Sequence, residues 1–262
     1  MSIALTQPLI WIASYPKSGN TWVRFLACNL LFGPQETAAA LSTLVPDMHE
    51  LAALGEVATG GLLKTHFPYS ADLPQAARTV AAIYVVRHPA DVLASNFFYS
   101  LRSSTASNAA PAAFDAYVEA FIAGRGDARW RELGMGCWDE HVRSWLSAPF
   151  PVLKIRYEDL ASDPLGTGTA IARILQPGCT EAQVREAVQN SSFERMRSVE
   201  REDIRAQRVG IFYKPYLEGS IAAGRRFMRR GMVGDGLARL NPVQRAALNK
   251  AFGPLIAELG YT

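Results

Sequence analysis

The chain has 262 residues, of which 49% are hydrophobic and 19% charged, and its formal net charge is +3. This composition is ample for a packed core and too apolar for a disordered chain, so we expect a single domain over residues 1–262. The mild positive charge suits anionic small molecules and is a weak argument for a nucleic-acid partner.

The cysteines and the apolar runs exclude further classes of protein. Cys28, Cys137 and Cys179 stand apart, without a CxxC pair or zinc-ligand spacing, so we expect reduced thiols and no metal site. The apolar run at 9–13 is too short for a signal peptide or a membrane span, and no later run reaches about 18 uncharged residues. These features predict a soluble cytoplasmic protein with no membrane partner.

Apolar runs alternate with helical patterns along the chain. Strands are predicted at 9–13, 61–65, 80–86 and 151–156, and helices at 21–31, 89–100, from Tyr157 onward, and at 242–259 with Asn241 as the N-cap. Residues 102–111 and 201–224 lack a sustained period and are predicted loops. Alternating strands and helices favour an α/β fold, a three-layer α/β/α domain with a mostly parallel central sheet of the P-loop nucleotide-kinase type.

The loop at 15–22, between the first strand and its helix, combines groups that bind phosphate. Lys17 supplies positive charge and Gly19 allows close approach of the backbone. The helix that follows offers free N–H groups and the positive end of its dipole. A Walker A loop would need glycines at 12 and directly before the lysine, but the chain has Ile12 and Pro16 there. The loop therefore predicts an anion site that differs from the standard ATP-binding motif.

Six segments, in order along the chain, resemble motifs of the PAPS-dependent sulfotransferase family, the soluble cytosolic and bacterial type. They are YPKSGNTW at 15–22, KTHFP at 64–68, VVRHPADVLAS at 85–95, RYEDL at 156–160, NSSFERM at 190–196 and FMRRGMVGDG at 227–236. PAPS is 3′-phosphoadenosine 5′-phosphosulfate. The resemblance implies in-line transfer of its sulfuryl group to an acceptor, with 3′,5′-ADP as the product and no metal ion.

The resemblance implies catalytic roles for Lys17, Lys64, His66 and Ser95. His66 would take the proton of the acceptor, which suits a group whose ordinary pKa is near neutral. Lys17 would neutralise the departing phosphate oxygen, and Lys64 would steady the sulfuryl oxygens. The other histidines receive no role; they are His49, His88 and His141.

The remaining motif residues are expected to hold the nucleotide. The resemblance implies that the 5′-phosphate lies on the loop, the adenine lies beside aromatic side chains, and arginines bind the 3′-phosphate in bidentate fashion. The expected donor-binding residues are Lys17, Ser18, Gly19, Asn20, Thr21, Trp22, Arg87, Ser95, Tyr157, Ser192, Phe193, Met196, Arg229, Arg230 and Gly231.

Three residues depart from the family pattern. Asn20 replaces a threonine and is still expected to donate to a phosphate oxygen. Arg230 replaces a lysine, which keeps the charge but changes the donor geometry. Gly236 replaces a tryptophan, so we expect the loop that it ends to be anchored differently.

Two other functions compete with this one. A P-loop kinase for small metabolites shares the fold but needs the missing Walker glycines. A basic module for nucleic acid or a sulfated polymer, at 195–230, is disfavoured because its arginines are intermixed with Glu and Asp.

The acceptor pocket is expected outside the donor motifs, at 42–54, 97–145 and 201–226. This zone is rich in aromatic residues, which favours a hydroxyl on a phenol, alcohol or natural product. They are Phe67, Phe98, Tyr99, Phe114, Tyr117, Phe121 and Trp138. The oligomeric state is open and includes a homodimer, although the family's dimerisation segment is not evident at 240–261.

Overall fold

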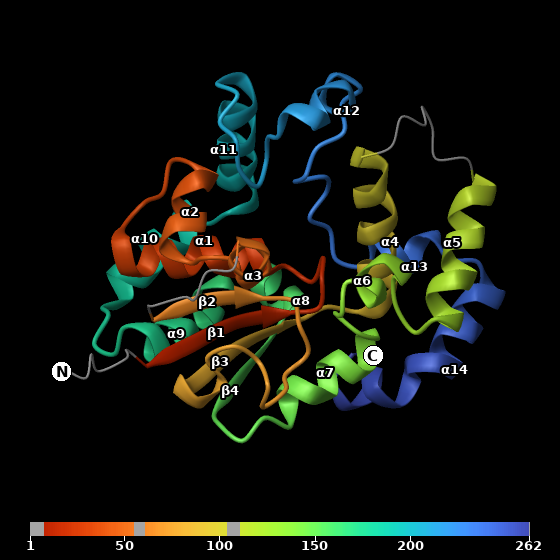
Figure 1. Ribbon diagram of the computed structural model, residues 1–262, viewed down its shortest axis with the longest axis horizontal. Coiled ribbons are helices and arrows are strands. Elements are labelled where there is room, and N and C mark those ends of the chain that lie inside the picture. Colours follow the sequence, from red (N-terminus) through yellow and green to blue (C-terminus); the bar gives the residue numbers. More distant parts are fainter. Residues whose placement is uncertain (1–7, 55–60, 104–110, 262) are drawn as a thin grey trace.

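Four parallel strands form the centre of the fold (Figure 1). The computed structural model describes residues 8–54, 61–103 and 111–261. Its strands are β1 (Leu9–Ser14), β2 (Leu62–Thr65), β3 (Thr79–Val86) and β4 (Val152–Arg156). The sheet order is β2-β1-β3-β4, and every neighbouring pair is parallel. The predicted parallel α/β sheet is therefore confirmed.

Helices cover both faces of this sheet, and the side chains of β3 show why. Ile83 and Val85 enter one buried cluster, whereas Ala82, Tyr84 and Val86 enter the other. This alternation follows from the two-residue period of a strand. Because both faces of the strand are apolar, each face needs a layer of helices.

The helices on the Ile83 side of the sheet pack around the first cluster, which contains Ile83 and Val85. They are α1 (Asn20–Phe32), α2 (Ala38–Leu44), α8 (Tyr157–Ser162), α9 (Pro164–Leu175), α10 (Glu181–Asn190) and α11 (Phe193–Arg205). Helix α3 (Met48–Leu54) lies near the β2 edge and contributes Met48 to the other cluster.

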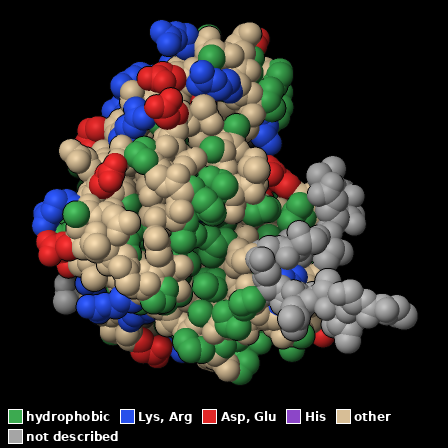
Figure 2. Space-filling view, turned by 90° about the vertical axis from the view of Figure 1, so that its left-hand side faces the viewer, with side chains coloured by type: hydrophobic (Ala, Val, Ile, Leu, Met, Phe, Trp, Pro, Cys, Tyr) green, Lys and Arg blue, Asp and Glu red, His purple; other side chains and the backbone are tan. Residues whose placement is uncertain are grey.

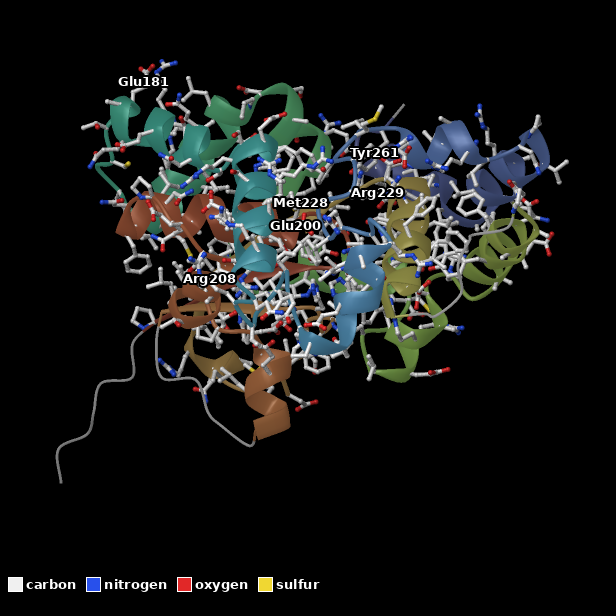
Figure 3. All side chains as sticks on the ribbon, turned by 90° about the horizontal axis from the view of Figure 1, so that it is seen from above. Glu181, Glu200, Arg208, Met228, Arg229 and Tyr261 are labelled. Carbon is white, nitrogen blue, oxygen red and sulfur yellow. The ribbon has the colours of Figure 1, made fainter. Side chains whose placement is uncertain are left out.

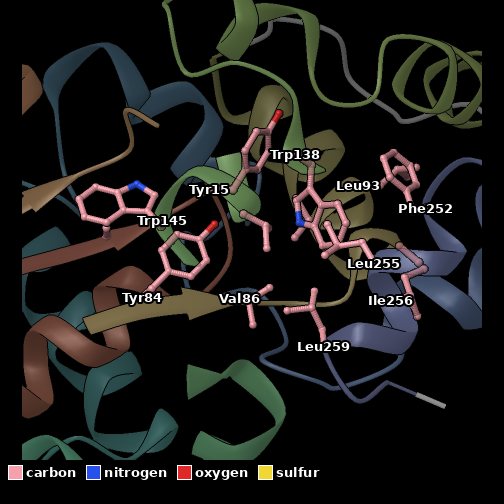
Figure 4. Packing of buried hydrophobic residues seen from close by; sticks show 14 of the residues in the cluster. Tyr15, Tyr84, Val86, Leu93, Trp138, Trp145, Phe252, Leu255, Ile256 and Leu259 are labelled. Carbon is pink, nitrogen blue, oxygen red and sulfur yellow. The ribbon is translucent and has the colours of Figure 1, made fainter. Parts of the chain in front are cut away.

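The second cluster lies on the Tyr84 side and is rich in aromatic side chains. Figure 4 shows Tyr84 and Trp145 on one side of it and Trp138 packed toward Phe252 on the other. Its helices are α4 (Pro89–Ser100), α5 (Pro111–Ala123), α6 (Ala128–Glu132), α7 (Trp138–Leu146), α13 (Asp235–Arg239) and α14 (Pro242–Glu258). Asn241 caps α14 by accepting from the backbone N–H of Gln244, as predicted.

The prediction of a loop over 201–224 is wrong at 201–205 and 218–222, which are helical, and holds for the irregular backbone at 206–214. Helix α11 continues to Arg205, and α12 (Glu218–Ala222) follows a short 3₁₀ turn at Pro215–Leu217. The buried stripe of α11 includes Met196, Val199, Glu200 and Asp203. Because two of these buried residues are carboxylates, the buried face of α11 does not appear as an apolar stripe in the sequence, and hydropathy does not show the helical period. The other predicted loop, 102–111, lies mostly outside the described residues.

The carboxyl ends of the four strands meet at one edge of the sheet, as parallel pairing requires. The residues that follow them are Tyr15, His66, Arg87 and Tyr157. Ligands bind at this edge in open α/β sheets, so the fold brings four of the sequence motifs together. Among the helices described, none has the length and apolarity needed to cross a membrane.

Candidate active site

A cavity of about 610 Å³ lies at the carboxyl edge of the sheet, and we call it the central cavity. It is lined by fifteen of the seventeen residues singled out from the sequence; the two that do not line it are Ser18 and Ser192. The motifs therefore converge on a single site, although their individual roles remain predictions. Ser192 lines a neighbouring cavity of about 400 Å³ beside Trp22 and Phe193.

The loop before α1 is shaped for an anion. Gly19 has φ 109° and occupies the N-cap position of α1 without a side-chain hydrogen bond to the helix. A Cβ at Gly19 would lie 2.7 Å from Cδ2 of Tyr157, so no other residue fits there without movement. The first turn of α1 thus has no side-chain cap and faces the central cavity, which is the arrangement that binds phosphate.

Three polar side chains at motif positions have the following surroundings within the protein. The Asn20 amide donates to the Ile12 carbonyl at 3.1 Å and to the Ser14 hydroxyl at 3.3 Å, so it ties the loop to β1. The Ser18 hydroxyl is fully buried and has no partner among the described residues. The Ser192 hydroxyl caps α11 by accepting from Arg195 N–H at 3.2 Å. A contact between one of these residues and a bound nucleotide would therefore need the backbone of that residue or a different rotamer of its side chain.

Lys17 lies between two aromatic rings. Its Nζ is 4.0 Å from the ring centre of Tyr99 and 4.2 Å from that of Phe227. Burial, and then the charges of nearby arginines, hold the pKa of Lys17 well below its ordinary value; the arginines are Arg102, Arg87 and Arg129. This end of the cavity gathers positive charge, which suits an anionic ligand.

His66 is held in one tautomer by β1. Its Nδ1 lies 2.7 Å from the carbonyl oxygen of Ser14, which can only accept a hydrogen bond, so Nδ1 carries the proton. The lone pair is then on Nε2, and His66 lines the central cavity. Burial, and then the charge of Lys64, hold the pKa of His66 well below its ordinary value. The imidazole is neutral at neutral pH, as a general base must be.

Two other histidines fix the backbone of His66. The His66 N–H donates to Nε2 of His49 at 3.0 Å, and Nε2 of His141 donates to the His66 carbonyl at 3.0 Å. Burial lowers the pKa of His49 to about 4 and that of His141 to about 3, so both are neutral partners. Sequence reasoning gave them no role, because neither belongs to a motif.

Lys64 is an almost buried cation beside His66. Its Nζ forms an ion pair with Oδ2 of Asp47 at 2.7 Å. Both residues line the central cavity. Asp47 precedes α3 and lies in the zone predicted only for the acceptor, so sequence reasoning missed its contact with Lys64.

A third group of charges occupies the far side of the cavity. The guanidinium of Arg87 stacks over the ring of Tyr157 at 3.9 Å and donates to the Met232 carbonyl at 2.9 Å. Arg229 and Arg230 both pair with Asp235, at 2.5 and 3.0 Å. Burial raises the pKa of Asp235, but hydrogen bonds from Arg229 and Arg239 outweigh it and lower the pKa to about 2. The arginines outnumber their carboxylate, so this region stays cationic.

Glu200 fixes the segment that carries these arginines. Its carboxylate is fully buried and accepts from the backbone N–H groups of Phe227 at 2.6 Å and Met228 at 3.0 Å. Figure 3 shows Glu200 on α11 beside Met228, with Arg229 farther along the same segment. The contact joins residues 27 and 28 apart in the sequence. It holds Phe227 in place beside Lys17, and it fixes the backbone directly before Arg229 and Arg230.

Asp91 anchors the end of the same segment at Gly236. One Asp91 oxygen accepts from Gly236 N–H at 2.6 Å and the other from Gly234 N–H at 2.9 Å. A Cβ at position 236 would lie 2.0 Å from the Ala90 carbonyl oxygen. A larger residue is therefore excluded in this arrangement, and the departure at Gly236 has a physical reason.

Gly236→Ala is expected to destabilise the protein by about 1–3 kcal/mol, because the backbone of Ala90 must move to admit the methyl group. Urea unfolding at equilibrium measures the change. Gly253→Ala is the matched control: it lies inside α14, and a Cβ there meets nothing within 4 Å. The control should be neutral or slightly stabilising. Equal stability of the two variants would contradict the packing at Gly236.

The seven aromatic residues of the predicted zone divide into three groups. Tyr99 and Phe67 line the central cavity, whereas Phe121 and Trp138 are fully buried in the core. The other three pack elsewhere: Phe114 and Tyr117 lie against the core, and Phe98 lies beneath the guanidinium of Arg229. The wall of the central cavity has further apolar residues that were not singled out, namely Trp130, Leu133, Met135, Ile211, Tyr216 and Leu217.

An uncapped helix start and clustered cations at the carboxyl edge of a parallel sheet define a site for an anionic ligand, and His66 adds a neutral imidazole to the same cavity. Residues 7–260 match the family model described as the sulfotransferase domain. The chain is 31% identical over 242 residues to sulfotransferase 1A1 of Bos taurus, covering 86% of this chain and 75% of the relative. The chain therefore belongs to the sulfotransferase family.

Other relatives agree with this assignment. Sulfotransferase 2A1 of Rattus norvegicus is 28% identical over 253 residues, covering 92% of this chain and 82% of the relative. Mouse sulfotransferase SULT7A1, solved in complex with PAP, has a TM-score of 0.66 at 21% identity, covering 97% of this chain and 84% of that chain. Retinol dehydratase, solved with androsterone and PAP, has a TM-score of 0.68 at 21% identity, covering 97% and 82%. The sulfotransferase prediction is confirmed, and these relatives give the kinase alternative no support.

Proposed function

We propose that this sulfotransferase takes PAPS as its donor and transfers the sulfuryl group in line to a hydroxyl of a small organic acceptor. The observation that carries the proposal is the position of His66. The Ser14 carbonyl holds the proton on Nδ1, which leaves Nε2 unprotonated, and His66 lines the same cavity as Lys17 and Lys64. A base and two cations around one cavity are the groups that this chemistry needs.

The transfer balances without a covalent enzyme intermediate. The acceptor oxygen forms a bond to sulfur while the bond between sulfur and the 5′-phosphate oxygen breaks. The acceptor proton passes to Nε2 of His66, and the electron pair leaves with 3′,5′-ADP. Lys17 neutralises the charge that grows on the leaving oxygen, Lys64 steadies the sulfuryl oxygens, and Ser95 lines the same wall. The side chains supply the charge, so the proposal includes no metal requirement.

The nucleotide is proposed to lie across the cavity from the loop to the arginines. The start of α1, from Gly19 to Trp22, would take the 5′-phosphate, and Arg87, Arg229 and Arg230 would take the 3′-phosphate. The adenine would lie beside Trp22, Tyr157 and Phe193. Trp22 and Phe193 line both cavities, and Tyr157 lines the central cavity with its ring against that of Trp22. PAP is part of the solved complexes of two structural neighbours, which supports this proposal.

The acceptor is proposed to be an aromatic or apolar alcohol. The wall of the central cavity includes apolar side chains, among them Phe67, Trp130 and Met135. Complexes of a neighbour with androsterone and with retinol support a small apolar acceptor.

We also propose that residues 1–262 form one domain and work in the cytoplasm, where the free thiols of the three cysteines would stay reduced.

The distribution of charged side chains on the surface does not support the alternative of a nucleic-acid-binding module. On the face drawn in Figure 2, the Lys and Arg side chains are interspersed with Asp and Glu, and they form no single basic field. Exposed arginines of α11 alternate with glutamates in the same way. Such a surface is typical of a solvated helix.

A ligand-stabilisation experiment tests the donor. We expect 3′,5′-ADP at 100 times its Kd to stabilise the protein by about 2.7 kcal/mol in EDTA, whereas ATP with magnesium should have a much smaller effect. Labelled PAPS with a panel of phenols and alcohols, analysed by mass spectrometry, then tests transfer. Stabilisation by ATP and magnesium alone, or a panel without any sulfated product, would contradict the proposed function.

A further inference from the structure

The ion pair between Lys64 and Asp47 stands at the wall of the central cavity. The Lys64 side chain is 7% exposed and that of Asp47 is 17% exposed, with 2.7 Å between Nζ and Oδ2. Lys64 is two residues before His66, so the two-residue period of β2 directs both side chains to the same side. An ammonium with so little contact with water is stable only beside an opposite charge.

Backbone contacts hold Asp47 in its position before any ligand binds. Lys64 N–H donates to the Pro46 carbonyl at 2.9 Å, and Asp47 forms a parallel bridge with Lys64 beside β2. The second Asp47 oxygen accepts from the His49 N–H at 3.0 Å. The carboxylate is therefore fixed from two sides, and one of its oxygens remains free for Lys64.

We propose that Asp47 is a positioning residue that keeps Lys64 protonated and directed into the central cavity. The use of that cation in transfer rests on the proposed function. The effect of Asp47 on the protonation of Lys64 does not. Asp47 lies outside the six motif segments, in the segment at 46–49.

The charges around Lys64 indicate which way its proton equilibrium moves. Burial comes first and lowers the pKa of Lys64 to about 8, and Arg24 acts in the same direction. Asp47 and the exposed Glu50 oppose them. The neighbouring histidines, His49 and His66, are neutral. Removal of the Asp47 charge leaves Glu50 as the remaining group that opposes burial, so the pKa of Lys64 is expected to fall by roughly 1–3 pH units. Lys64 would then lose its proton near neutral pH.

Lysine NMR tests this without any enzyme assay. The chain has five lysines, so protein labelled with ¹³C at lysine Cε gives five signals, and Lys64→Arg identifies the signal of Lys64. In the wild type that signal should titrate near pH 8. In Asp47→Asn, which keeps the shape and one acceptor oxygen, the midpoint should fall by at least about one pH unit. If Asp47→Asn does not fold, Asp47→Ser serves, since its hydroxyl still accepts from the His49 N–H.

Glu50→Gln is the matched control, because Glu50 acts on the same ammonium without contacting it. In Glu50→Gln the titration midpoint of Lys64 should stay much closer to the wild-type value. An unchanged midpoint in Asp47→Asn, or an equal fall in Glu50→Gln, would overturn the proposal. These results hold whether or not PAPS is the donor, so a failure here is separate from a failure of the proposed function.

The activity profile gives the second readout. With PAPS and any phenol that the panel shows to be sulfated, the alkaline limb of kcat/KM should move to lower pH in Asp47→Asn. In a Lys64→Arg background the same substitution should no longer move that limb, because arginine keeps its charge. A limb that moves equally in both backgrounds would contradict a role through Lys64.

Discussion

His66→Asn is expected to lower turnover by roughly 100-fold to 10,000-fold, the range for loss of a general base, while 3′,5′-ADP binds as tightly as before. The variant separates the two nitrogens of the imidazole. An asparagine amide can replace Nδ1 as the donor to the Ser14 carbonyl, which His66 reaches at 2.7 Å. Nothing in asparagine replaces the lone pair of Nε2. Turnover with labelled PAPS and calorimetry with 3′,5′-ADP measure the two effects.

The pH profile is the internal control for this variant. Because the pKa of His66 lies well below its ordinary 6.5, the wild-type base stays unprotonated as the pH falls through 6.5. Activity should therefore persist into mildly acidic buffer and decline only below it. The small residual activity of His66→Asn should lack this decline. Turnover within tenfold of wild type would remove His66 from the base role.

The sequence predicted the site better than the details around it. The ordered motifs placed Lys17, His66, Arg87 and Tyr157 at strand or helix boundaries, and parallel strands bring such boundaries to one edge. Local pattern and topology together therefore predict the cavity and the residues that line it.

The supporting contacts were not predictable in the same way. Asp47, His49 and Glu200 act on residues 17 to 28 positions away, and each of them also binds or contacts a backbone N–H group, which has no sequence signature. The buried carboxylates of α11 also resemble surface charges in the sequence, which is why its last residues, 201–205, were predicted as part of a loop. Their burial depends on partners that only the folded chain brings close.

The direction of side chains at motif positions is also difficult to predict from the sequence. Asn20 was expected to donate toward phosphate, but its amide finds two acceptors on β1 at 3.1 and 3.3 Å. A residue type fixes what a side chain can donate, whereas the nearest buried acceptor decides where it points. Gly236 shows the converse, since the carbonyl of Ala90 excludes a side chain there.

Lys17→Met is expected to lower kcat by roughly 100-fold to 1000-fold, the cost of one charge aimed at a developing anion. Methionine preserves the unbranched chain and packs between the rings of Tyr99 and Phe227, which flank Nζ at 4.0 and 4.2 Å. Only the charge is lost. Single-turnover measurements with PAPS and a phenol separate this loss from product release.

Lys250→Met on the exposed side of α14 controls for the change in net charge and should behave as wild type. Lys17 is surrounded by arginines that lower its pKa, so its ammonium is stabilised when negative charge arrives. Charge increases on the leaving oxygen during transfer, and the loss should therefore fall mainly on kcat. A variant that keeps kcat within about threefold of wild type while losing affinity for 3′,5′-ADP would assign Lys17 to donor binding alone, because uniform binding leaves the chemical step unchanged.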